Sequence, residues 1–100
     1  MAQVGDRVGA VLKSDTDTVH FLGFGVYNGR QVPPPGIGMF GLDAHELGIT
    51  NPEIILDNGK KVYGCECWWG TETGVQKAIQ GKRIIHVDIE QYRSEVEANG

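Results

Sequence analysis

The stretch IILDNGKKVYGCECWW, residues 54–69, decides the fold that we expect for this chain. Its Asn58-Gly59 pair lies between two apolar runs. This is the strongest local signal for a β-hairpin, because both central residues of a type I′ turn need a positive φ. A two-residue turn here predicts that Ile54 lies opposite Tyr63. The stretch therefore predicts a tight antiparallel hairpin that continues into a tryptophan-rich strand.

Side chains alternate between the two faces of a strand, so the same stretch also predicts which residues are buried. One face is expected to carry Trp69 together with Tyr63 and both cysteines, which is typical of a core. The other face is expected to carry Trp68 beside Glu66. Two readings of Trp68 remain open at this point. Either helices or another subunit cover both faces, or this indole is a platform for a flat ligand.

The rest of the chain predicts short strands joined by turns, together with two short helices. Gly23 and Gly25 interrupt one expected strand, which is typical of a bulge, a bend or a close approach of another backbone. Asn-Gly at residues 28–29 predicts a second hairpin, and Pro33–Pro35 ends its returning strand. Asp43, and Thr73 with Gly81, supply helix caps. The expected strands are 7–13, 18–27, 30–32, 54–57, 60–69 and 84–92, and the expected helices are 43–47 and 73–80.

These elements predict a mostly β (α+β) fold, a small antiparallel SH3-like bent sheet or barrel with two short helices. One hundred residues are enough for a single domain, 1–100, and the segment from about residue 94 reads as a polar tail. The formal net charge of −4 argues against double-stranded DNA or a membrane as the partner. The first residues lack signal-peptide character and no apolar run has transmembrane length, so we expect a cytoplasmic protein.

Cys65 and Cys67 are the only cysteines, and they give little support to metal binding or catalysis. Two thiolates could join His20, His45 or His86 around zinc, but a one-residue spacing differs from the usual two to four residues. A nucleophilic cysteine would need a base beside it, and the sequence places none there. We therefore expect buried free thiols, no catalytic residue, no metal site and no cofactor, in a protein that is not an enzyme.

Aromatic and charged residues near the turns instead indicate ligand binding. An exposed Trp68 can stack on a flat ring, which contributes about 1–3 kcal/mol per base, and Tyr27 could supply a second plane. Basic side chains at turns and strand ends can reach a phosphate, and a carboxylate can accept a hydrogen bond from a base or a ribose hydroxyl. A solvated surface is the ordinary alternative for such charges. The candidate charged residues are Arg30, Glu66, Glu72, Lys82 and Arg83.

Two motifs, LGFGVYNG at residues 22–29 and GCECWWG at 64–70, resemble motifs in small phage and bacterial proteins, most of them uncharacterised. The resemblance covers about residues 20–90. The glycine- and aromatic-rich make-up is also similar to that of phage anti-defence proteins that sequester nucleotide immune signals. It implies a small nucleotide-like ligand, bound in the host cytoplasm if a phage encodes the protein. A barrel of 100 residues is too small to enclose such a ligand easily, so we expect a homo-oligomer with pockets at subunit boundaries. The alternative is a protein–protein interaction module that inhibits a host protein or serves in a virion.

Overall fold

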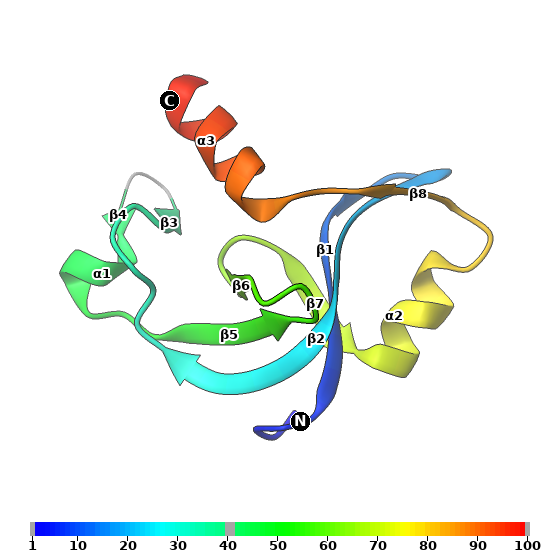
Figure 1. The fold of residues 1–100 in the computed structure, drawn as a ribbon, viewed down its shortest axis with the longest axis horizontal. Coiled ribbons are helices and arrows are strands. Elements are labelled where there is room, and N and C mark those ends of the chain that lie inside the picture. Colours follow the sequence, from blue (N-terminus) through cyan, green and yellow to red (C-terminus); the bar gives the residue numbers. More distant parts are fainter. Residues whose placement is uncertain (1, 40–41, 100) are drawn as a thin grey trace.

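The chain folds into one strongly bent, open sheet with helices around it, in a computed structural model that describes residues 2–39 and 42–99 (Figure 1). Its six strands follow the order β6-β5-β2-β1-β7, with β8 paired to β2 in parallel, and β3 and β4 form a separate two-stranded sheet. The strands are β1 (Arg7–Ser14), β2 (Thr18–Gln31), β3 (Gly38–Met39), β4 (Leu42–Asp43), β5 (Asn51–Leu56), β6 (Lys61–Tyr63), β7 (Trp68–Thr71) and β8 (Arg83–His86). The helices are α1 (Ala44–Leu47), α2 (Glu72–Ile79) and α3 (Ile89–Asn99). This confirms the predicted mostly β, antiparallel α+β class.

Strand β2 is the centre of the sheet and is longer than the sequence predicts. The predicted turn at Asn28-Gly29 is wrong, because β2 continues through it to Gln31. A register shift between Tyr27 and Arg30 accommodates the two residues as a bulge against β5, and Gly29 has a φ of 79° there. Asn28 Nδ2 also donates to the buried Glu53 across this bulge, at 2.8 Å. Pairing along the whole strand therefore overrides the local turn signal.

The β5–β6 hairpin exists, but its turn is one residue longer than predicted. Leu56 and Lys60 close a three-residue loop, since Leu56 N donates to Lys60 O at 2.8 Å. Gly59 has a φ of 88°, the conformation that the last residue of such loops adopts. Ile54 consequently lies opposite Val62, so the predicted pairing of Ile54 with Tyr63 is wrong by one position.

The expected continuous strand from the hairpin to the tryptophans is also wrong, because the chain turns at Gly64. Gly64 N donates to Pro52 O at 2.9 Å, and Glu66 N donates to Tyr63 O at 2.9 Å. The chain then enters β7, which pairs with β1 rather than with β5. The four residues 64–67 thus join the two edge strands, β6 and β7. The sheet is therefore bent almost into a barrel while remaining open.

Two of the three helices follow the sequence signals closely. Asp43 caps α1 as predicted, with Oδ1 accepting from His45 N at 2.9 Å. Helix α2 begins two residues earlier than predicted, because Thr71 rather than Thr73 is its cap and accepts from Gly74 N at 3.1 Å. Gly81 follows the C-cap of α2 with a φ of 78°, as predicted.

Helix α3 replaces the end of the predicted last strand and the predicted polar tail. Asp88 Oδ1 accepts from Glu90 N at 3.0 Å, which starts the helix directly after β8. Ile89, Tyr92 and Arg93 then fall on one helical face, at the spacing of three and four residues that also suits a helix. Ile89 is 1% exposed and joins the main core.

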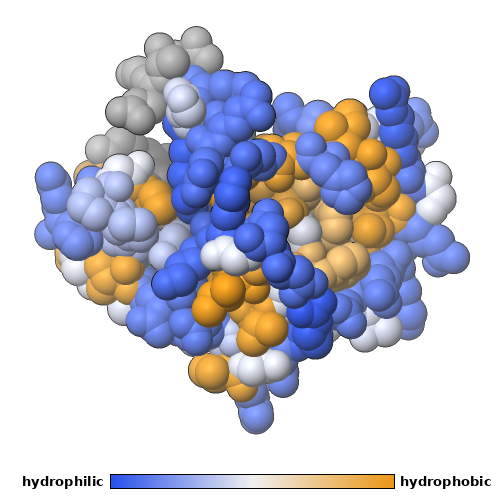
Figure 2. Space-filling view, in the orientation of Figure 1, coloured by the Kyte–Doolittle hydropathy of each residue, from blue (hydrophilic) through white to orange (hydrophobic). Residues whose placement is uncertain are grey.

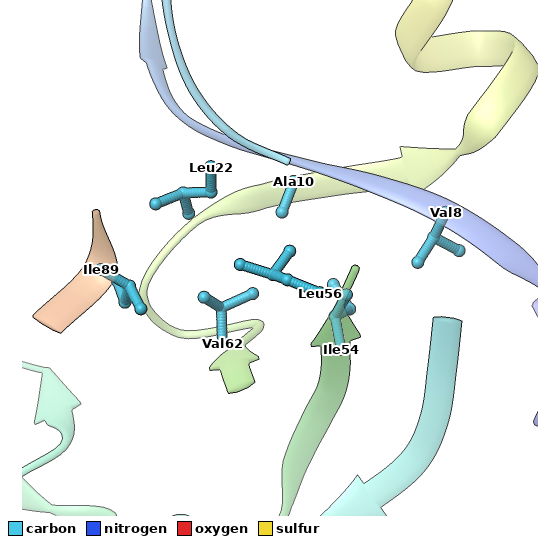
Figure 3. Close-up of a cluster of buried hydrophobic side chains, with 7 residues drawn as sticks. All are labelled: Val8, Ala10, Leu22, Ile54, Leu56, Val62 and Ile89. Atoms are coloured by element: carbon cyan, nitrogen blue, oxygen red, sulfur yellow. The ribbon is translucent and has the colours of Figure 1, made fainter. Parts of the chain in front are cut away.

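The core is divided between the two faces of the bent sheet. On the concave side, apolar side chains of four strands and α3 point toward one another (Figure 3). These are Val8, Ala10, Leu22, Ile54, Leu56, Val62 and Ile89. A second cluster lies under α2 and consists of Val11, Val19, Phe21 and Val75. Because adjacent residues of β7 point to opposite faces, the two tryptophans are separated between these two environments.

Candidate functional site

The candidate site is an apolar hollow beside Trp68, with a volume of about 340 Å³. Trp68 is 55% exposed, so more than half of this large aromatic side chain is open to solvent. Lys82 brings a positive charge to the same hollow. The lining residues are Val11, Ser14, Val19, Trp68, Ala78, Ile79 and Lys82. The hollow therefore combines a flat aromatic surface, an apolar wall and one cation.

Three elements place these groups together. Trp68 lies opposite Val11 in the β7–β1 pairing, on the face where Val75 and Ile79 pack α2 against the second cluster. Apolar side chains gather between the strands and α2 in Figure 2. Lys82 follows the end of α2, and its Nζ donates to the backbone oxygen of Asp15 at 2.9 Å. This bond fixes the ammonium group at the rim of the hollow.

The chemistry of the hollow suits a flat ring with an acidic group. An indole face can stack on a heteroaromatic ring, because every base has a π-face. The Lys82 ammonium has three hydrogens and donates one of them to Asp15 O, so two remain for an anion. The Asp15 carboxylate accepts from the backbone of Thr18 and Asp17 at 2.8 and 3.0 Å, which lowers its pKa. Arg83 comes next after Lys82, is exposed, and lies opposite Thr18.

Tyr27 does not supply a second plane beside Trp68. Its ring instead stacks on Trp69, with centroids 5.2 Å apart and an interplanar angle of 10°. Both of these rings pack against the main core, on the opposite face of the sheet from Trp68. Arg30 is also elsewhere, since its guanidinium donates to Thr50 Oγ1 and O at 3.1 and 2.7 Å. The predicted site therefore loses these two members.

The two predicted acidic ligand contacts are both engaged in ion pairs away from Trp68. Glu66 lies 2.7 Å from Arg93, and its side chain is only 8% exposed. Glu72 lies 3.0 Å from Arg7 on the surface. Of the seven predicted binding residues, the structure brings Trp68 and Lys82 into one hollow, and Arg83 adjoins Lys82 in the chain.

Sequence reasoning missed the apolar wall of this hollow and the role of Arg93. The wall has a helical signal, because Val75 and Ile79 are four residues apart and meet the strands on one side of α2. Arg93 falls between the predicted last strand, 84–92, and the predicted polar tail from about residue 94, so no role was predicted for it. A search for helical spacing from Ile89 onward would have found it.

The cysteines are free thiols, as predicted, and both are partly buried. Burial raises the pKa of Cys67 to about 12, and the charge of Glu66 acts in the same direction. The pKa of Cys65 is also raised, again mainly by burial. Thiols that resist ionisation are poor nucleophiles and poor metal ligands. Within residues 2–39 and 42–99, no three His, Cys, Asp or Glu side chains are grouped where they could hold a metal ion.

Comparisons with known proteins assign no function to this site. The chain matches no protein-family model, and neither the curated proteins nor the solved structures contain a match. In the described part of the chain, no helix has both the length and the apolar character needed to cross a membrane.

Proposed function

We propose that this protein binds a small nucleotide-like ligand and sequesters it without chemical change. The observation that carries the proposal is the half-exposed indole of Trp68 at an apolar hollow that also holds the Lys82 ammonium. The base would stack on the indole, and a phosphate would lie near Lys82 and the neighbouring Arg83. The similarity of the glycine- and aromatic-rich make-up to phage anti-defence proteins that sequester nucleotide signals supports the same proposal, and we further propose that the protein acts in the cytoplasm.

The size of the hollow supports binding at a subunit boundary. A volume of about 340 Å³ is at the lower end of ligand sites and is open on one side. A nucleotide with two phosphates or two bases would extend beyond it. A second copy of the chain could cover the remaining surface of the ligand, so we propose that the binding form is a homo-oligomer.

Thermal denaturation in the presence of nucleotides tests the proposal. The probes are cyclic dinucleotides, cyclic oligonucleotides and ADP-ribose derivatives. At 100 times its Kd, a ligand stabilises the folded state by about 2.7 kcal/mol, which is a clear rise in Tm. Loss of stacking in Trp68→Ala should weaken binding by about 1–3 kcal/mol, or roughly 5- to 150-fold. Lys82→Ala should weaken the binding of phosphorylated ligands only.

Lys61 provides the matched control, because it is an exposed lysine on β6 and does not line the hollow. Lys61→Ala should bind the ligand like the unsubstituted protein. Mass spectrometry of the recovered ligand separates sequestration from catalysis, since a sequestered ligand returns intact. If no nucleotide raises the Tm, or if Trp68→Ala binds as tightly as the original chain, the proposal is wrong.

A protein–protein interaction module is the second candidate, and one observation favours it. Large apolar side chains are exposed in and beside α1: Leu42 is 59%, Leu47 is 54% and Ile49 is 49% exposed. Exposed apolar groups of this size commonly mark a contact with another protein. Sedimentation of the Leu47→Glu variant distinguishes self-association from binding to a different protein. A loss of self-association would assign this surface to a second copy, whereas a monomer that never binds nucleotides would favour a foreign partner.

A further inference from the structure

A larger hollow, of about 580 Å³, lies on a different part of the molecule from Trp68. Its walls are the Pro34–Ile37 segment on one side and α3 on the other, and the turn with Cys65 and Glu66 contributes the floor. Figure 1 shows α3 rising above the sheet opposite the segment that leads to β3 and β4. The volume is within the range of small-molecule sites.

Arg93 is held in this hollow with one end of its guanidinium free. Its Nε donates to Glu66 Oε2 at 2.8 Å, and its Nη2 donates to Glu66 Oε1 at 2.7 Å and to Lys61 O at 2.9 Å. These three bonds use every hydrogen on Nε and Nη2. The two hydrogens on Nη1 have no acceptor among the described residues. The fork is therefore fixed in place, with Nη1 available to a ligand.

The other polar side chains of the hollow offer few free acceptors to a ligand that donates hydrogen bonds. The Glu66 carboxylate already accepts two bonds from Arg93 and one from Tyr63 N, at 3.1 Å. The Tyr92 hydroxyl has no partner in the described part of the chain and can turn toward an acceptor. Ile37, Val96 and the ring of Tyr92 add apolar surface. The hollow thus offers donors from the protein beside flat apolar walls.

We propose that this hollow is a second binding site, for a small flat molecule that carries an acceptor oxygen and no positive charge. The acceptor, a ring carbonyl or a carboxylate, takes hydrogen bonds from Arg93 Nη1 and the Tyr92 hydroxyl. The flat body lies against Tyr92 and the Pro34–Ile37 segment. A cation is disfavoured, because it meets the Arg93 guanidinium and a Glu66 carboxylate that already accepts three hydrogen bonds. This site does not depend on the function proposed for Trp68.

Three probes that share one phenyl ring test the proposal by nuclear magnetic resonance on isotope-labelled protein. Acetophenone offers a neutral carbonyl, benzoate a carboxylate and benzylamine a cation. We expect the resonances of the Cys65 amide and the Arg93 Nε–H to shift as the probe is added. The titration should give a Kd of about 1 mM, typical of such small probes. At least one acceptor probe should produce them, and benzylamine should not. The stronger of the two acceptor probes identifies the group preferred.

Two variants and one control establish where the probes bind. Val96 is 50% exposed at the edge of the hollow, so Val96→Trp should fill it without disturbing the core and should weaken binding at least tenfold. Arg93→Lys keeps the charge but removes Nη1, and it should also weaken binding. Trp68→Ala should leave the shifts unchanged. No binding by either acceptor probe, equal binding of benzylamine, or full binding by Val96→Trp would overturn the proposal, whether or not Arg93→Lys folds.

Discussion

Gly25 is a residue at which β2 and β5 come too close for any side chain. A Cβ built there would lie 2.3 Å from Ile55 O and 2.7 Å from Leu56 Cα, and backbone atoms cannot move aside cheaply. We expect Gly25→Ala to lower the free energy of unfolding by about 3 kcal/mol or more. Gly70 is the matched control. A Cβ at Gly70 would meet only side-chain atoms, the nearest at 3.8 Å.

Gly70→Ala should therefore be neutral or slightly stabilising, because alanine loses less backbone freedom than glycine on folding. Chemical denaturation of the two variants compares them directly. Equal stability of Gly25→Ala and the original chain would show that the strands can separate at this point. The sequence predicted a close approach, a bulge or a bend at this glycine, and the register with Ile55–Leu56 decides among them.

The separation of the two tryptophans to opposite faces was predicted correctly from a register that was wrong, whereas the exposure of Trp68 was left open. Trp69 packs on the core and Trp68 is exposed, as alternation along a strand predicts. Adjacent residues of a strand point to opposite faces, and this alternation holds in β7 whichever strand it pairs with. The partner could not be predicted, because the turn at Gly64 is fixed by Pro52, a contact with no local signal.

At the scale of elements, the Arg93–Glu66 pair attaches α3 to the sheet. The pair also raises the pKa of Arg93, with hydrogen bonding to Glu66 as the largest cause. Arg93→Ala would leave the Glu66 carboxylate, only 8% exposed, without its cation. We expect a loss of about 1–3 kcal/mol, below the value for fully buried pairs because Arg93 is itself partly exposed. The loss should appear in urea denaturation and as faster amide exchange in α3.

Arg7 is the matched control for this prediction. It also forms a bidentate pair, with Asp57 at 2.7 and 2.8 Å, but both side chains are exposed. Water and salt screen such a pair, so Arg7→Ala should cost much less than Arg93→Ala. Similar losses in the two variants would contradict the assignment of Arg93 as the anchor of α3.

The sequence predicted elements well where a cap or a single strand defines them. The side chain of Asp43 and the backbone of Gly81 mark helix ends, and the run from Arg7 forms the strand that was predicted there. The elements around Asn28 and after Asp88 were wrong because two local patterns competed. A turn pair also fits a bulge, and Ile85, Val87 and Ile89 fit a strand as well as the start of a helix. Contacts with distant parts of the chain determined which of the two patterns formed at each place.

At the scale of the whole molecule, two buried groups make stability depend on alkaline pH. The pKa of Cys67 is raised from 9.0 to about 12, and that of Tyr63 from 10.0 to about 12, in both cases mainly by burial. Both groups are neutral below about pH 8 in either state, so their contribution is constant there. Above pH 9 the unfolded chain loses these protons first, and the free energy of unfolding falls as pH rises toward 12.

Denaturation at a series of pH values between 8 and 11 measures this effect. Each group contributes a slope of up to about 1.4 kcal/mol per pH unit once its unfolded form is ionised. Cys67→Ala should make the fall that begins near pH 9 shallower, leaving the contribution of Cys65, whose pKa burial also raises, and the later fall due to Tyr63. An unchanged curve in Cys67→Ala would show that the thiol ionises freely in the folded protein.

The parallel pairing of β8 with β2 has a consequence for how the protein is made. Residues 18–21 emerge from the ribosome well before their partners at residues 83–86. Until then the β8 side of this segment has unpaired backbone groups, which are a template for wrong pairing with another chain. Contacts between distant parts of a chain also form slowly. Newly made chains therefore depend on residues 83–86 to complete this side of the sheet, and a truncated chain that ends before β8 should aggregate during synthesis.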